Sequence, residues 1–191
     1  FQLTVPGLLS VSLTNVSNQI ESFMSLYNSE GLILATKLAD ARGMSIELER
    51  VISDGDYYIC IGDATGKHIS LVPYLLKSNF TAAKPIACQE TKQGSISVRG
   101  AKEIYNFTAS ANDAVTIRAV ETSGSLWAYL ELYAPDGIKL AEAFDTIDKV
   151  LPVTGKYTII VRDHGNNDTG DYCLIFEKLN NPCSPAITCG Q

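Results

Sequence analysis

Four oxygen-bearing side chains lie within nine residues of one another and form the best candidate metal site of the chain. They are Asp163, Asn167, Asp168 and Asp171, and Gly165 between them permits a tight turn. Calcium takes six to eight hard oxygen ligands, which carboxylate and amide groups supply. The spacing differs from the EF-hand pattern, which requires a glutamate at its twelfth position. The segment therefore predicts either a calcium-binding loop or a solvated hairpin loop.

The five cysteines favour disulfide chemistry over metal chemistry. No two of them form a CxxC motif, and none has a histidine at zinc-ligand spacing. Cys183 and Cys189 flank a short turn, so we expect a local bridge between them in an oxidising compartment. Cys88 could pair with Cys60 or Cys173, although Cys60 and Cys173 could equally be unbridged residues of strands. An odd number of cysteines leaves one thiol free or bonded to another chain.

Groups suited to catalysis are scarce. The two histidines are His68 and His164, and His164 follows Asp163 in a turn-rich run. The sequence contains no GxSxG nucleophile elbow, no HExxH zinc motif and no P-loop. A Ser-His-Asp triad needs an orienting framework, which the sequence does not show. We therefore expect no enzymatic activity, no catalytic residue and, calcium apart, no cofactor.

Aromatic rings could bind a ligand by stacking. The available rings are Trp127, Tyr129, Tyr133 and Tyr172. Trp127 and Tyr129 share one face of an expected strand, and Leu126 and Leu130 share the other. Both faces are apolar, so the pattern alone does not select the face that packs in the core. For Trp127 we favour a core position over an exposed platform for sugars.

Four Asn-X-Ser/Thr sequons could accept N-linked glycans if the protein reaches a secretory compartment. They begin at Asn15, Asn79, Asn106 and Asn167. We expect Asn106 to be buried in a strand, which leaves Asn15, Asn79 and Asn167 as candidates. The alternative is that short sequons arise by chance in strands rich in Asn and Thr.

The composition supports a folded domain and excludes two classes of function. The chain has 191 residues, of which 46% are hydrophobic and 19% charged, and its formal net charge is −6. This apolar content is sufficient for a packed core. Nucleic-acid binding requires a basic face, which an acidic chain does not favour. No apolar run of about 18 residues is present, so we expect no membrane-spanning segment.

Three pairs of segments recur about 100 residues apart. Residues 26–35 match residues 132–141, and residues 54–63 match residues 154–163. The segment 85–89 is echoed in 186–191. We interpret these matches as two copies of one module of ordinary small-domain size, 1–84 and 85–191. The first copy then lacks its own first strand, and residues 185–191 begin a further copy.

The repeated segments are predicted to be strands. Tyr157, Ile159 and Val161 alternate with Thr158, Ile160 and Arg162 at a period of two, and most of these residues favour strands. Turn signals such as Pro135-Asp136-Gly137 and Thr169-Gly170 separate such runs. Short strands divided by turns favour an all-β, antiparallel sandwich. Residues 35–42 are also compatible with a helical turn.

The second copy resembles the bacterial pre-peptidase C-terminal (PPC-type) domains. The resemblance rests on Y-x-F-x-A at 105–109, L-Y-x-P-D-G at 132–137, L-P-x-T-G-x-Y-x-I-x-V at 151–161 and T-G-x-Y-x-L at 169–174. The first copy is a degenerate relative that keeps the hairpin at Tyr27 and the strand at Tyr57 but lacks a closing tyrosine in 66–69. The resemblance implies two tandem jelly-roll-like β-sandwich modules in a secreted or cell-surface protein. It also implies a non-catalytic spacer or a binder of collagen or polysaccharide, and some members of the family bind calcium.

These observations lead to three hypotheses about function. The first is a non-catalytic structural or adhesive module of a secreted or cell-surface repeat protein. The second is a subunit of an extracellular filament, in which a strand of a neighbouring copy fills the sheet edge left by the missing first strand. The third is an accessory domain of a secreted enzyme that binds polysaccharide or collagen. The expected partners are therefore other copies of the chain, neighbouring repeats or one of these polymers.

Overall fold

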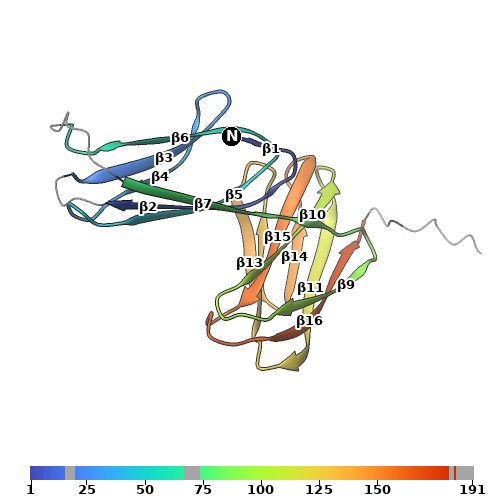
Figure 1. Cartoon of the computed structure of the whole chain (residues 1–191). Coiled ribbons are helices and arrows are strands. Elements are labelled where there is room, and N and C mark those ends of the chain that lie inside the picture. Colours follow the sequence, from blue (N-terminus) through green and yellow to red (C-terminus); the bar gives the residue numbers. More distant parts are fainter. Residues whose placement is uncertain (16–19, 67–73, 181–182, 184–191) are drawn as a thin grey trace, which may run out of the picture. The chain divides into compact units, whose positions relative to one another are not determined.

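A computed structural model describes residues 1–15, 20–66, 74–180 and 183. The described residues form strands and turns and contain no helix, which confirms the prediction of an all-β protein (Figure 1). The chain divides into two compact units, Phe1–Ala82 (unit 1) and Ala83–Gln191 (unit 2). The division falls two residues before the predicted position because Lys84 and Pro85 pair with a strand of unit 2. Since the described part has no helix, none of its segments is a helix long and apolar enough to cross a membrane.

Unit 1 contains two antiparallel sheets, with strand orders β1-β6-β3-β4 and β5-β2-β7. Its strands are β1 (Gln2–Leu3), β2 (Gly7–Asn15), β3 (Ser22–Asn28), β4 (Ile33–Leu38), β5 (Ile46–Ile52), β6 (Gly55–Asp63) and β7 (Tyr74–Ala82). Of the segment 35–42 that could have formed a helical turn, residues 35–38 belong to β4, which pairs with β3, and residues 39–42 contain bends and a turn. Core residues come from both sheets, for example Val11 and Leu48 from one and Met24 and Leu26 from the other, so the unit is a sandwich.

Unit 2 has the strand orders β13-β12-β15-β10-β8 and β14-β11-β16-β9. Its strands are β8 (Lys84–Pro85), β9 (Thr91–Ile96), β10 (Lys102–Ala109), β11 (Ala114–Gly124), β12 (Ala128–Tyr133), β13 (Lys139–Phe144), β14 (Thr146–Val150), β15 (Gly155–Asp163) and β16 (Gly170–Lys178). Tyr157, Ile159 and Val161 of β15 are fully buried, and Thr158 and Ile160 between them are buried as well. The first three pack in one core with residues of the opposite sheet such as Ile117 and Phe176.

The strand pairings of the two units correspond one to one over seven strands. In unit 1, β2 lies between β5 and β7, and in unit 2, β11 lies between β14 and β16. In the other sheet of each unit, β3 lies between β4 and β6, and β12 lies between β13 and β15. β1 pairs with the first residues of β6 as the end of β10 pairs with the first residues of β15.

Local details recur at the matching positions. The β3–β4 ladder shifts register between Leu26 and Tyr27, and the β12–β13 ladder shifts between Leu132 and Tyr133. The Tyr57 hydroxyl donates to the carbonyl oxygen of Ser53 at 3.0 Å, and the Tyr157 hydroxyl donates to the carbonyl oxygen four residues before it. These shared features lie in the segments that the sequence repeats.

The hairpin turns of these ladders also match. Gly31 and Gly137 have φ angles of 78° and 76°, a conformation that glycine adopts without steric cost. In the second turn the Asp136 carboxylate accepts a hydrogen bond from the backbone nitrogen of Ile138 at 2.9 Å. This arrangement explains why Asp and Gly stand there.

The two units differ at one edge. In unit 2, β9 pairs with β16 along Thr91–Ile96, whereas β7 pairs in the described residues with β2 alone. The absence of a first strand in the first copy stays a prediction. β1 is also short, with two residues against eight in β10.

The inner face of β7 is consequently exposed. Val11 of β2 pairs with Leu48 of β5 and with Ser78 of β7. Ile117 of β11 pairs with Ile147 of β14 and with Phe176 of β16. Aligning Val11 with Ile117 therefore aligns Ser78 of β7 with Phe176 of β16. In this register Tyr74 and Leu76 match Tyr172 and Leu174 of β16. Tyr74 and Leu76 are 53% and 39% exposed, whereas their counterparts are buried.

The predicted closing segment without a tyrosine, 66–69, lies outside the described residues apart from Gly66. Tyr74 begins β7 at the position of Tyr172, and each pairs with the matching residue of the central strand. The sequence comparison missed it because it placed the closing strand at residues 66–69. Tyr74 has the position in unit 1 that Tyr172 has in unit 2, but Tyr74 is exposed whereas Tyr172 is buried.

Candidate functional site

Four rings gather on the solvent face of the sheet that contains β12, β13 and β15. Trp127 precedes β12, Tyr129 lies in it, Phe144 ends β13 and His164 follows β15. Because Ala128 and the alternate residues after it point into the core, Trp127 and Tyr129 must point outward. Cross-strand pairing then places Phe144 directly opposite Tyr129. We call these four residues the aromatic cluster.

The rings of the aromatic cluster contact one another directly. Trp127 stacks on Phe144 with centroids 4.7 Å apart and an interplanar angle of 23°. His164 lies 5.0 Å from the Trp127 ring, 4.8 Å from the Phe144 ring and 5.2 Å from the Tyr129 ring. Trp127 is 55% exposed and Phe144 41%. The cluster is a compact, solvent-facing aromatic surface rather than part of the core.

The expectation that Trp127 packs in the core is therefore wrong. The face of Leu130 forms the core, with Leu130 and Leu132 fully buried. Both faces of the strand are apolar at its start, so the alternation did not decide between them. Phe144, His164 and Arg162 were not identified as members of a site. The hairpin register around Pro135-Asp136-Gly137 was the signal that could have placed Phe144 opposite Tyr129.

Charged groups beside the aromatic cluster are paired with one another. The Arg162 guanidinium carbon lies 4.5 Å from the centre of the Tyr129 ring, and its Nε donates to Glu131 Oε1 at 3.1 Å. Lys139 Nζ lies 2.8 Å from Glu142 and 3.4 Å from Glu131. Burial acts to raise the pKa of Glu131, but the Tyr133 hydroxyl, Arg162 and Lys139 outweigh it and lower that pKa. Glu131 is thus an anion held by two cations.

Unit 1 carries no such cluster at the matching positions. The pairings of β3 with β4 and β6 place Phe23, Leu38 and Gly62 where unit 2 has Tyr129, Phe144 and Arg162. The backbone nitrogen of Ala64 donates to the Glu21 carbonyl as that of His164 donates to the Trp127 carbonyl. Glu21 and Ala64 are therefore the counterparts of Trp127 and His164. The sandwich forms in unit 1 without these rings.

Asp163, the first residue of the candidate metal loop, is buried and faces its own backbone. Its Oδ1 accepts from the backbone nitrogen of Trp127 at 3.1 Å, and its Oδ2 accepts from those of Asn167 and Asp168 at 3.0 and 3.2 Å. Burial acts to raise the pKa of Asp163, but these hydrogen bonds and one from Gly165 outweigh it, so the pKa is lowered. The carboxylate holds the loop from β15 to β16 in place.

The other predicted metal ligands do not converge on Asp163. Asp171 lies on the other sheet from Asp163, and its carboxylate accepts a hydrogen bond of 2.6 Å from the hydroxyl of Ser123, its cross-strand partner in the same sheet. This bond lowers the pKa of Asp171. The Asp168 carboxylate accepts from the Asn167 side chain at 3.2 Å. In the described part of the chain no group of three His, Cys, Asp or Glu side chains is arranged to hold a metal ion. Calcium binding therefore stays a prediction.

A polar cavity of about 610 Å³ lies in unit 2 beside the ends of β9, β10 and β16. Lys84, Glu103, Asp171 and Cys173 are among its lining residues. Lys84 forms an ion pair with Glu103, and this hydrogen bond raises the pKa of Lys84. Asp171 is bound to Ser123, so the charged groups of the cavity already have partners. The cavity does not present a nucleophile with an adjacent base.

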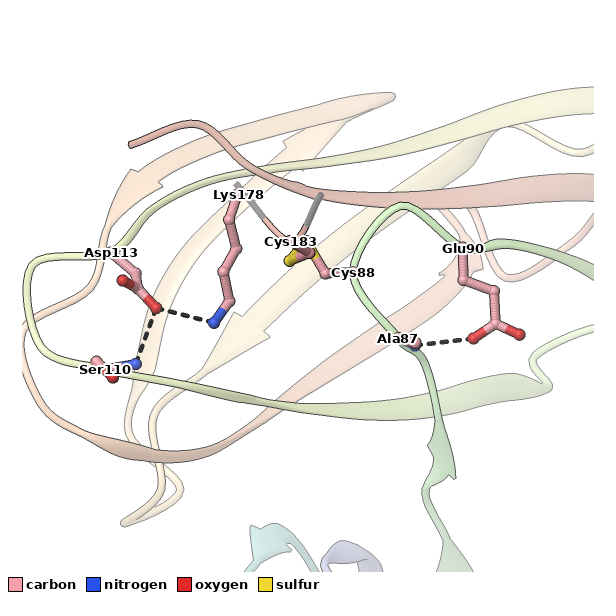
Figure 2. Close-up of a disulfide and its surroundings, with 7 residues drawn as sticks. All are labelled: Ala87, Cys88, Glu90, Ser110, Asp113, Lys178 and Cys183. Carbon is pink, nitrogen blue, oxygen red and sulfur yellow. Dashed lines mark hydrogen bonds and ion pairs between the residues drawn. A yellow bond between two sulfur atoms is a disulfide. The ribbon is translucent and has the colours of Figure 1, made fainter. Parts of the chain in front are cut away.

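The disulfide joins Cys88 to Cys183, which corrects the predicted pair of Cys183 with Cys189 (Figure 2). Its Cα atoms lie 6.0 Å apart, and 95 residues separate the two cysteines in sequence. The turn after β8 carries Cys88 to the end of β16, because the backbone nitrogen of Gln89 donates to the Phe176 carbonyl at 2.7 Å. Spacing favoured the nearer cysteine, whereas the fold brings the distant one into reach.

The remaining cysteines are only partly described. Cys60 and Cys173 lie in strands and are free. This agrees with the predicted alternative in which both are unbridged residues of strands. Cys189 lies outside the described residues, as does the segment 185–191 that was predicted to begin a further repeat.

The asparagines of two sequons are exposed, and the side chain of a third is hydrogen-bonded. Asn79 is exposed on β7, and Asn167 is exposed in the loop between β15 and β16. Asn106 lies within β10 and donates from its side chain to the Ala83 carbonyl at 2.9 Å. Asn15 ends β2, and the rest of its sequon lies outside the described residues.

No protein-family model matches this chain, and no curated protein matches it. Among solved structures, one similar chain is PliG of Aeromonas hydrophila, a periplasmic inhibitor of g-type lysozyme. It is 18% identical and has a TM-score of 0.43, and the match covers 51% of this chain and 96% of that chain. Another is the pre-peptidase C-terminal domain of a collagenase from Bacillus anthracis, which is 19% identical with a TM-score of 0.44. That match covers 50% of this chain and 94% of that chain.

Proposed function

We propose that this chain is a non-catalytic structural or adhesive segment of a secreted or cell-surface repeat protein. In this proposal units 1 and 2 are tandem copies of one jelly-roll-like, PPC-like sandwich. The observation that carries the proposal is the recurrence of the same pairings, register shift and tyrosine hydrogen bond in both units. Repeating one module along a chain is how many extended proteins are built.

Two features support an extracellular place of action. The Cys88–Cys183 disulfide is of the kind that persists in oxidising compartments. Two candidate glycosylation sites, Asn79 and Asn167, are exposed residues. Asp163 holds a loop and Glu131 binds two cations, so these two carboxylates serve the fold, which supports the proposed non-catalytic role.

The open edge of unit 1 favours a second candidate function, the subunit of an extracellular filament. An edge strand offers unpaired backbone groups to any extended segment that reaches it. In unit 2 the matching edge is occupied by β9, which pairs antiparallel to β16 and buries Ile96 in the core. We propose that a β9-like strand of a neighbouring copy pairs with the edge of β7 as β9 pairs with β16. The exposed Tyr74 and Leu76 would then gain the burial that Tyr172 and Leu174 already have.

Self-association of the full chain tests this proposal. Light scattering after size-exclusion chromatography should show a mass that rises with concentration, and negative-stain microscopy should show fibres. Leu76→Lys should leave monomers, because a charge on the inner face of β7 would be buried by an added strand. Leu32→Lys is the matched control, since Leu32 is 62% exposed in the β3–β4 turn. A wild-type chain that stays monomeric at millimolar concentration would remove the filament function.

A further inference from the structure

We infer that the aromatic cluster of unit 2 binds a neutral polysaccharide by stacking sugar rings on the exposed faces of Trp127 and Phe144. This inference rests on the proposed adhesive function and names its ligand. The aromatic cluster comprises Trp127, Tyr129, Phe144 and His164, on three neighbouring elements of one sheet. Sugar rings present flat faces of C–H groups, which pack on aromatic rings, and hydroxyl groups at their edges, which need polar partners.

The fold does not require these rings. At the matching positions unit 1 has Glu21, Phe23, Leu38 and Ala64, and its sandwich has the same pairings. Exposing an indole and a phenyl ring to water has a free-energy cost that a purely structural surface avoids. Three of the four matching residues in unit 1 are not aromatic. The aromatic cluster is therefore an addition to one copy, and we attribute it to binding.

The geometry of the rings selects the class of ligand. A cage for a quaternary ammonium group needs rings that stand apart and surround the cation. Here Trp127 and Phe144 stack on each other at 4.7 Å, and His164 contacts both, so no space remains between the rings. A ligand can pack only on their outer surface. A flat apolar face, such as that of a hexose unit, fits this surface.

The charges beside the cluster select a neutral polymer. Arg162 is bound to Glu131, and Lys139 lies between Glu131 and Glu142. These two cations and two anions balance, so the surface offers no excess positive charge to an anionic polysaccharide. Lys139 and Glu142 have side chains 40% and 48% exposed, which leaves polar atoms available to sugar hydroxyls.

The surface is also held in place before a ligand arrives. Arg162 stacks on Tyr129 while its Nη1 donates to the carbonyl oxygens of Asp163 and His164, both at 3.0 Å. Aromatic side chains have few rotatable bonds, and mutual contact restricts them further. A binding surface that is ordered beforehand loses little entropy on binding.

Affinity gel electrophoresis of the full chain tests the inference. The gels contain one of four neutral polysaccharides, namely hydroxyethylcellulose, barley β-glucan, glucomannan and galactomannan, or one of two anionic ones, alginate and hyaluronan. We expect retardation by at least one neutral polymer and none specific to the anionic ones. Trp127→Glu combined with His164→Ala should weaken the retardation at least about tenfold. These substitutions install the residues of unit 1, so circular dichroism should show that the fold persists.

Tyr58→Ala is the matched control, because Tyr58 is 59% exposed on β6 and lies outside the cluster. It should bind as the wild type does. No retardation in any neutral polymer would overturn the inference, as would retardation that survives the double substitution or occurs only in the anionic gels. Loss of self-association in the double variant, without any polysaccharide binding, would assign the cluster to a protein partner and would likewise overturn it. None of these outcomes alters the test of the β7 edge, which uses Leu76→Lys.

Discussion

The hydroxyl oxygens of Tyr105 and Tyr172 lie 3.0 Å apart inside unit 2, and their hydrogen bond joins its two sheets. Tyr105 belongs to β10 and Tyr172 to β16. Burial raises the pKa of both phenols, so both stay protonated at physiological pH. Gly94 on β9 packs directly against the pair, and a side chain has no room there, because a Cβ at that position would lie 2.4 Å from the Tyr172 hydroxyl. In unit 1 the counterpart of Tyr172 is the exposed Tyr74.

Tyr172→Phe should destabilise unit 2 by about 1–2 kcal/mol, because the buried hydroxyl of Tyr105 loses its partner. Urea unfolding followed by near-ultraviolet circular dichroism would measure the change. The double variant Tyr105→Phe/Tyr172→Phe should lose less than the sum of the two single losses, since it leaves no unpaired hydroxyl. Strictly additive losses would show that the hydrogen bond does not couple the sheets.

Asp163→Asn should destabilise unit 2 by about 1–3 kcal/mol at pH 7, because the amide cannot accept all the backbone hydrogen bonds that the carboxylate accepts. The pKa of Asp163 is lowered in the folded protein, so its contribution is full above the unfolded pKa of about 4. The contribution is lost as the pH falls through the lower, folded pKa. The difference between variant and wild type in urea unfolding should therefore shrink between pH 5 and pH 2. A difference that is constant over this range would show that the stabilisation does not come from the ionised carboxylate of Asp163.

Cys88→Ser should lower the stability of unit 2 by about 2–4 kcal/mol, because the disulfide restricts the unfolded chain over 95 residues. Thermal unfolding with and without reductant gives the same comparison without a mutation. Cys60→Ser is the control, since Cys60 is a free, exposed cysteine of unit 1. Equal melting of wild type and Cys88→Ser would place the functional bridge elsewhere, for instance at Cys189.

Adding 2 mM calcium should leave the melting temperature of the chain unchanged. Both carboxylate oxygens of Asp163 already accept backbone hydrogen bonds. Asp171 lies on the other sheet from Asp163 and is bound to Ser123 of the neighbouring strand. A ligand that binds the folded state raises the melting temperature, so differential scanning calorimetry would detect it. A rise of several degrees that Asp168→Asn abolishes would contradict this expectation and confirm the predicted calcium site.

Much of the fold follows from the sequence, because alternation and turn residues act locally. The Pro135-Asp136-Gly137 turn and the strand over residues 155–163 are where the pattern places them. The choice of face for Trp127 was not local, since both faces of β12 are apolar at its start and pairing with β13 and β15 decides it.

The disulfide is a second case in which distant chain segments decide. Cys88 and Cys183 meet because β9 pairs with β16. The spacing of cysteines along the sequence does not predict this strand pairing. The aromatic cluster is of the same kind, since β12, β13 and the end of β15 each supply part of it. Sites assembled from several strands follow from the register of the sheet more than from any single motif.

Hydrogen–deuterium exchange along β7 tests the central claim most directly, because that claim assigns an open, strand-accepting edge to unit 1. The measurement compares residues 74–82 with residues 170–178 in dilute and concentrated solutions of the full chain. Rapid exchange in β7 at low concentration, slowing at least about tenfold as chains associate while β16 stays protected throughout, is the predicted result. Protection of β7 that equals that of β16 in dilute monomer would contradict it.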